Sequence, residues 1–133
     1  MKNSKALKAT LLISGLIATG IGGAILFMPV TFSATSGIDL KFIANISLLS
    51  EIRSAGGAMF ASGILIMSGT FIKKLTFTSA VISSYMYLSY GAARIFSIVM
   101  DGVPTENLVQ AAILEIVIGA ICLFALVKYQ ENV

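Results

Sequence analysis

Four long apolar stretches constrain this chain more than any other feature of its sequence. They cover about residues 7–28, 49–72, 75–100 and 108–127. Each holds roughly the 20 residues that a helix needs to cross a hydrocarbon core about 30 Å thick. Only helices and closed barrels satisfy every backbone polar group in lipid, and these stretches lack the alternation of barrel strands. The sequence therefore predicts an all-α membrane protein with four transmembrane helices.

The composition supports a membrane location and argues against several other classes. Of the 133 residues, 57% are hydrophobic and 11% are charged, whereas soluble domains carry about 25% charged residues. The length suits one domain, residues 1–133. The net charge of +3 does not indicate nucleic-acid binding, because the lysines lie at the ends of apolar stretches. With no histidine and a single cysteine, Cys122, we expect no disulfide, no metal site and no cofactor.

The positions of the lysines predict how the helices are oriented. Short connections make successive helices antiparallel neighbours in a bundle. One side of that bundle carries a group of lysines, comprising Lys2, Lys5, Lys8, Lys73, Lys74 and Lys128. The positive-inside rule places this side, and with it both termini, in the cytoplasm. We expect the protein to lie in the inner membrane of the cell. The connection at 29–47 then lies outside; Pro29 ends the first helix, and the form of this connection is not predicted.

Small residues at helical spacing predict close packing between helices. Gly15, Thr19 and Gly23 follow one another at four-residue intervals in the first stretch. In the last stretch, Glu115 lies four residues before Gly119 on a similar stripe. Small residues allow membrane helices to approach closely, so Glu115 should face a neighbouring helix.

Charged residues within the apolar stretches are the candidates for function, because they are costly in a membrane. Arg94 lies seven residues before Asp101, and thus roughly 10 Å below the outer end of its helix. Glu115 lies roughly 12 Å from the same side, so an Arg94–Glu115 ion pair would offset much of the cost of burial. Glu51 and Arg53 are about 200° apart around a helix, so they cannot both point inward. Arg53 shares its face with Gly56 and Gly57, which predicts that Arg53 is the inward one.

These observations predict an outward-facing charged pocket inside the membrane. Tyr90, Arg94, Ser97 and Asp101 share one helix face. The candidate ligand-binding residues are Glu51, Arg53, Tyr90, Arg94, Ser97, Asp101 and Glu115. Such a pocket would bind an anionic lipid headgroup or a small amphiphile.

The five charged residues among these candidates also have purely structural interpretations. Glu51 is favourable near a helix N-terminus, and Arg53 could extend to the outer surface. Arg94 and Glu115 could form a structural ion pair. Asp101 precedes Gly102 in a sequence typical of a turn.

Two motifs carry a resemblance to a known family. The sequence "EIRSAGG", which holds Glu51 and Arg53, is followed by "RIFSIVMDGVP", which runs from Arg94 to Pro104, and then by Glu115. In order and spacing, these residues resemble the bacterial family called domain of unknown function 4345. The resemblance implies a small four-helix inner-membrane protein without an established activity.

The function expected from the sequence is the binding of a small or lipid-like ligand in the charged pocket. A structural or accessory membrane subunit is an alternative, in which the Arg–Glu pairs stabilise the bundle and the small-residue stripes contact a second copy or a membrane partner. A third alternative is a membrane isomerase that uses a carboxylate for proton transfer, although no catalytic residues can be assigned. The sequence contains no histidine-based nucleophile pair and no phosphate-binding loop, which argues against an enzyme.

Overall fold

The computed structural model describes residues 1–39 and 45–131. These residues form helices and no strand, which confirms the all-α class. The elements in chain order are α1 (Lys5–Phe27), α2 (Pro29–Thr35), α4 (Ile46–Phe71), the short 3₁₀ turn η1 (Lys73–Leu75), α5 (Thr76–Asp101) and α6 (Glu106–Tyr129). The four predicted apolar stretches coincide with α1, α4, α5 and α6. Between them, the connection after Pro29 contains the short helix α2, and its residues 40–44 lie outside the described residues.

Local sequence explains where the helices begin and end. The Ser4 side chain accepts a hydrogen bond from the backbone N–H of Leu7 and caps the start of α1. As predicted, Pro29 prevents α1 from continuing; α1 ends at Phe27 and Pro29 occupies the first turn of α2. Gly102 ends α5 with a φ of +98°, a conformation that side chains with a Cβ rarely adopt.

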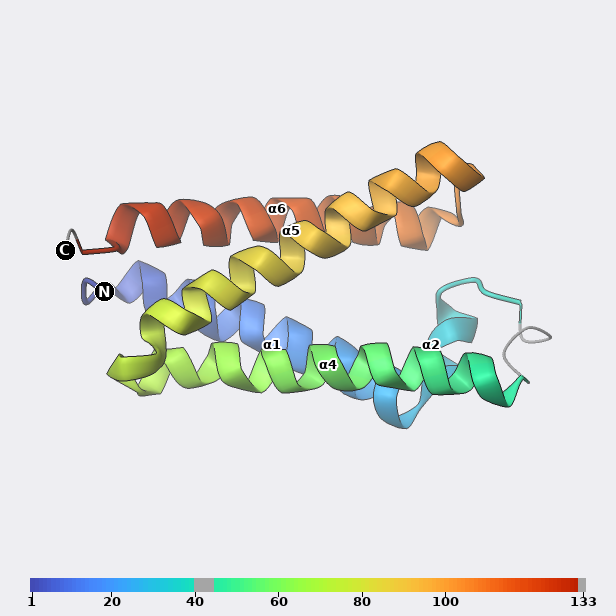
Figure 1. Cartoon of the computed structure of the whole chain (residues 1–133), viewed down its shortest axis with the longest axis horizontal. Coiled ribbons are helices and arrows are strands. Elements are labelled where there is room, and N and C mark those ends of the chain that lie inside the picture. The colour runs from blue at the N-terminus through green and yellow to red at the C-terminus, as the bar shows by residue number, and fades with distance from the viewer. Residues whose placement is uncertain (40–44, 132–133) are drawn as a thin grey trace.

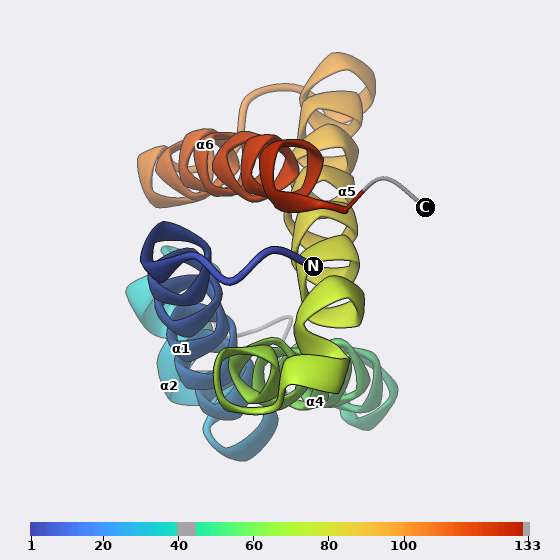
Figure 2. The ribbon, with the colours of Figure 1, turned by 90° about the vertical axis from the view of Figure 1, so that its left-hand side faces the viewer.

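The long helices run alternately in opposite directions (Figure 1). Viewed along the long axis, α1, α4, α5 and α6 surround a common centre (Figure 2). The most extensive contacts are between α1 and α4 and between α5 and α6. The N-terminus and the C-terminal end of α6 lie at the same end of the molecule as η1, whereas α2 and the connection between α5 and α6 lie at the other end (Figure 1).

Glycines make the contact between α1 and α4 unusually close. A Cβ on Gly15 would come within 2.8 Å of the backbone nitrogen of Met67, and one on Gly56 within 2.7 Å of that of Leu26. The predicted small-residue stripe is therefore a helix contact, although Gly22 takes part more closely than Gly23, which meets only the Phe60 ring. The backbones approach as in other small-residue membrane helix pairs.

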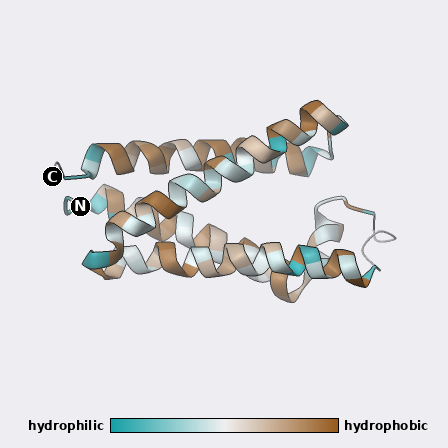
Figure 3. Cartoon of the chain, in the orientation of Figure 1, coloured by the Kyte–Doolittle hydropathy of each residue, from teal (hydrophilic) through white to brown (hydrophobic). Residues whose placement is uncertain are grey.

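Three helices of the described part, α1, α4 and α6, are long and apolar enough to cross a membrane. Figure 3 shows that these helices consist largely of hydrophobic residues, with hydrophilic residues mainly toward the helix ends. α5 is as long as α4 but contains more polar residues. Several of these, including Ser79, Ser83 and Ser84, are buried and donate hydrogen bonds to backbone carbonyls. The predicted fourth membrane span is therefore not established by the composition of α5.

Candidate functional site

A cavity of about 430 Å³ lies among α1, α2, α4, α5 and α6. Its size is within the range of about 300–1,000 Å³ that is typical of small-molecule sites. Most of the wall is aliphatic, with contributions from Ile17, Ile21, Ile25, Ile52, Met59 and Met86. A smaller set of polar side chains comes from α5, α6 and the region of α2. An apolar wall with a few polar groups is the usual composition of a ligand pocket.

Arg94 and Glu115 form an ion pair in the wall of this cavity. The Arg94 Nε atom donates to Glu115 Oε2 at 2.8 Å, from α5 to α6. The Glu115 side chain is 13% exposed and that of Arg94 is 33% exposed, so the carboxylate depends on the guanidinium for compensation. Within the described residues, the Arg94 side chain makes no other hydrogen bond. Its terminal nitrogens therefore remain available as donors to a molecule in the cavity.

Two tyrosines of α5 add to the same wall. Tyr90 is half-buried and lines the cavity, in agreement with its place among the sequence candidates. Tyr87, one helical turn earlier, also lines the cavity, but its hydroxyl donates to the backbone carbonyl of Ser14 on α1. Tyr87 therefore connects α5 to α1, and the Tyr90 ring offers an amphipathic surface to a ligand.

The structure places Arg53 outside the cavity, so the prediction that it points into the pocket was wrong. Its side chain is exposed, and its Nη1 atom donates to the carbonyl oxygen of Leu26 at 2.6 Å. The last carbonyls of a helix have no partner within that helix, and the break of α1 before Pro29 leaves Leu26 in this position. The face that Arg53 shares with Gly56 is directed at α1, because the glycines allow α1 to pack there.

Three further candidates also lie outside the cavity. Glu51 is exposed in the second turn of α4 and does not line the pocket. Ser97 Oγ and Asp101 Oδ2 are 3.4 Å apart on the exposed end of α5, and they bond to each other rather than to the ion pair. A shared helix face was not sufficient to bring these residues to Arg94, because α5 extends past the cavity before it ends at Gly102.

The sequence did not identify the polar residues that α2 and the start of α6 contribute. Ser33, Ser36 and Asn107 all line the cavity. Asn107 Nδ2 donates to the Thr35 carbonyl at 2.9 Å, and Thr105 Oγ1 donates to the Ser36 carbonyl at 2.8 Å. These bonds hold the segment after α2 against α6. The sequence of this short polar connection did not predict the contact, because the contact joins residues about 70 positions apart in the chain.

The site suits a molecule with an apolar body and a hydrogen-bond-accepting group. Its cation, Arg94, is already balanced by Glu115, so the pocket does not present a net excess of positive charge. The structure does not support the expectation that two arginines hold an anionic headgroup, because Arg53 lies outside the cavity and donates to the Leu26 carbonyl. The free donors of Arg94 fit a carbonyl, hydroxyl or single acidic group.

The fold and cavity define an all-α protein with membrane-compatible helices and a largely apolar internal pocket. The chain matches the family described as Domain of unknown function (DUF4345) over residues 6–126 and therefore belongs to it. No curated protein and no solved structure matched the chain.

Proposed function

We propose that the protein binds a small or lipid-like ligand in the cavity beside Arg94 and Glu115, and that it does so within a bacterial inner membrane. The observation that carries this proposal is the combination of an apolar volume of about 430 Å³ with an ion pair in its wall. A pair that served only to stabilise the helices would need no such volume beside it. A ligand with an aliphatic or ring body would contact the isoleucines and methionines, while its polar group accepts from Arg94.

In this proposal α5 is a fourth membrane span. Its 26 residues extend about 39 Å at 1.5 Å per residue, enough to cross the hydrocarbon core. α5 also joins the end of α4 to the start of α6, which lie at opposite ends of the molecule (Figure 1). If α4 and α6 both cross the membrane, α5 must cross it as well. Its exposed side chains include Phe77, Ile95 and Phe96, which suit lipid contact.

The lysine-rich end faces the cytoplasm in this arrangement, with both termini there. Reporter fusions test this orientation. Green fluorescent protein at the C-terminus should fluoresce, and alkaline phosphatase inserted after Gly102 should be active. The opposite pattern would place the cavity nearer the cytoplasmic side and reject the proposed orientation.

The ion pair alone also fits a structural or accessory subunit, and the α1–α4 glycine contact shows that helix packing is close. An isomerase would need a carboxylate free to move a proton. Glu115 is the carboxylate in the cavity wall, and its Oε2 atom already accepts from Arg94. The ligand-binding interpretation therefore accounts for the most features.

A matched pair of variants tests ligand binding. Ala111 lines the cavity, whereas Ala120 is exposed on the same helix. Native mass spectrometry of detergent-purified protein should detect a small molecule or lipid on the wild type and on Ala120→Phe, but not on Ala111→Phe. Thermal unfolding of the three proteins provides the control for folding. Equal ligand content in folded Ala111→Phe and wild type would reject the cavity as the binding site.

A further inference from the structure

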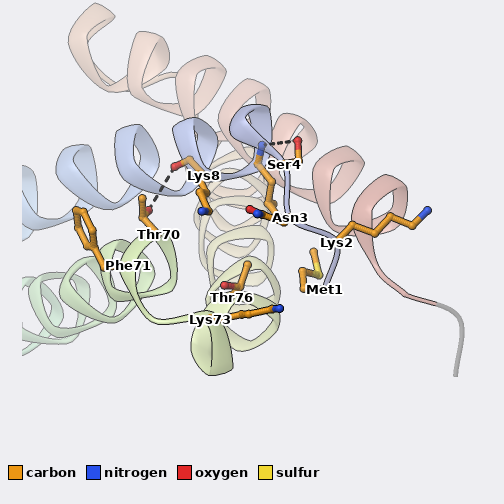
Figure 4. Close-up of a pocket in the computed structure, with 10 residues that line it drawn as sticks. Met1, Lys2, Asn3, Ser4, Lys8, Thr70, Phe71, Lys73 and Thr76 are labelled. Carbon is orange, nitrogen blue, oxygen red and sulfur yellow. Dashed lines mark hydrogen bonds between the residues drawn. The ribbon is translucent and has the colours of Figure 1, made fainter.

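A second, smaller cavity lies at the opposite end of the molecule from the ion pair, where the ends of α1, α4 and α5 meet. Its volume is about 100 Å³, enough for roughly three water molecules or one compact polar group. Figure 4 shows its wall, which includes Lys2, Asn3 and Lys8 from the N-terminal region and Thr70, Lys73 and Thr76 from α4, η1 and α5.

Three lysines without acidic partners line this cavity, and the Lys2 side chain extends away from Lys8 and Lys73 (Figure 4). Within residues 1–39 and 45–131, neither Lys2, Lys8 nor Lys73 forms an ion pair. The nearby acid Glu131 lies 3.6 Å from the N-terminal amine of Met1. The cavity therefore combines an uncompensated positive charge with a volume that can hold an anion.

The other polar groups of the wall hold its shape. Thr70 Oγ1 donates to the Lys8 carbonyl at 3.3 Å, and Thr76 Oγ1 donates to the Gly69 carbonyl at 2.8 Å. The Lys2 backbone N–H donates to the Tyr129 carbonyl at 2.8 Å, which fixes the N-terminal segment against the end of α6. Because both threonine hydroxyls already donate to the backbone, the donors left for an anion are the ammonium groups of Lys8 and Lys73 and the side-chain amide of Asn3.

We propose that this lysine cavity binds a phosphate group. Lysine is a common phosphate ligand that acts as a compact charge with three donors. Clusters of lysines next to membrane-spanning helices attract anionic lipid headgroups. Phe71 is 77% exposed and lies on the α4 side of the cavity, where it would contact the acyl or glycerol part of such a lipid (Figure 4). A free phosphate ion has the same chemistry, and the experiment distinguishes the two sources.

The test compares two double variants that remove equal charge from the same end. Lys8→Gln/Lys73→Gln removes lysines of the cavity wall, and Lys5→Gln/Lys74→Gln removes lysines that do not line it. All four side chains are exposed, so both variants should fold, as circular dichroism would verify. The full chain is placed in nanodiscs of phosphatidylcholine and phosphatidylglycerol, and retained lipid is measured by native mass spectrometry. In parallel, each protein in neutral detergent is titrated with inorganic phosphate while thermal unfolding is followed.

We expect the wild type and Lys5→Gln/Lys74→Gln to retain phosphatidylglycerol selectively, and Lys8→Gln/Lys73→Gln to lose this selectivity by about tenfold or more. That result identifies a phospholipid site. Stabilisation by inorganic phosphate that only Lys8→Gln/Lys73→Gln abolishes, without lipid selectivity, identifies a site for a free phosphate. Equal losses in both variants would mean that overall charge attracts the anion, and would overturn the proposal. Absence of lipid selectivity and of phosphate stabilisation in the wild type would overturn it as well.

Discussion

The Nε atom of Arg94 lies 2.8 Å from Oε2 of Glu115, and this contact joins α5 to α6 in the wall of the larger cavity. The two residues are 21 positions apart in sequence. The pair compensates a largely buried carboxylate, and in the proposed function Arg94 also donates to a ligand in the cavity. The energetic and functional consequences of this dual position can be separated experimentally.

The effects of removing Arg94 and Glu115 on stability should not add, because each side chain compensates the charge of the other. In Arg94→Gln the Glu115 carboxylate loses its compensating charge, so we expect the free energy of unfolding to fall by about 1–3 kcal/mol. This is less than the roughly 3–5 kcal/mol of a fully buried pair because Arg94 is 33% exposed. Glu115→Gln should cost a similar or smaller amount. The double variant should be more stable than the sum of the two effects by about 0.5–3 kcal/mol.

Unfolding in mild detergent, with all four proteins in the same buffer, measures this coupling energy. A strictly additive double variant would show that the two side chains do not depend on each other for stability. The same proteins can be assayed for retained ligand. Loss of ligand in the folded double variant would separate the binding role of the pair from its structural role.

The close approach of α1 and α4 gives a second prediction. In Gly56→Ala the new Cβ would lie 2.7 Å from the backbone nitrogen of Leu26, so α1 must shift away from α4. We expect a loss of about 1–3 kcal/mol, as for other overpacked sites. Gly20→Ala is the control, because a Cβ there meets nothing within 4 Å. Gly20→Ala should be neutral or stabilising by up to about 1 kcal/mol, since alanine favours a helix. Comparable melting temperatures for the two variants would contradict the inferred packing.

Apolar length made the helices predictable, whereas the contacts between them were only partly so. Each of the four long helices could be located because a run of about 20 apolar residues has few alternatives in a membrane. The stripe at Gly15 predicted a close helix contact but not its partner, which depends on three-dimensional arrangement. The short helix α2 could not be predicted, because its seven residues have no distinctive pattern of apolar residues.

The candidate site was predictable only where depth and charge acted together. Arg94 and Glu115 lie at similar depth on successive antiparallel helices, and a charge at that depth requires a partner. The same reasoning placed Arg53 wrongly, because its side chain donates to the Leu26 carbonyl at the end of α1. A pattern of side chains in the sequence does not reveal a backbone partner. Asn107 was missed because its role depends on the return of the chain after α2.

The corrected position of Arg53 leads to a third prediction. Arg53→Gln should lose the charged hydrogen bond to the Leu26 carbonyl, at a cost of about 1 kcal/mol because the site is exposed. It should leave the content of ligand in the larger cavity unchanged, since Arg53 does not line that cavity. Native mass spectrometry of Arg53→Gln beside Arg94→Gln tests this difference. Equal ligand loss in the two variants would mean that Arg53 contributes to the binding site after all.

The contact between α2 and α6 gives the last prediction. Thr105→Val keeps the shape of the side chain but removes the hydroxyl that donates to Ser36, and Asn107→Ala removes the donor to Thr35. Each change leaves a backbone carbonyl without its partner, so the segment from Pro29 to Ile38 should open more often.

Hydrogen exchange of the amides in this segment should accelerate by several-fold in either variant, whereas the middle of α4 should be unaffected. Glu106→Gln lies between the two positions, and within the described residues the Glu106 side chain makes no hydrogen bond to α2, so this variant serves as the control. Because Ser33 and Ser36 line the larger cavity, a bound ligand should also dissociate faster from Thr105→Val than from Glu106→Gln. Unchanged exchange in Thr105→Val and Asn107→Ala would show that packing, rather than these hydrogen bonds, holds α2 in place.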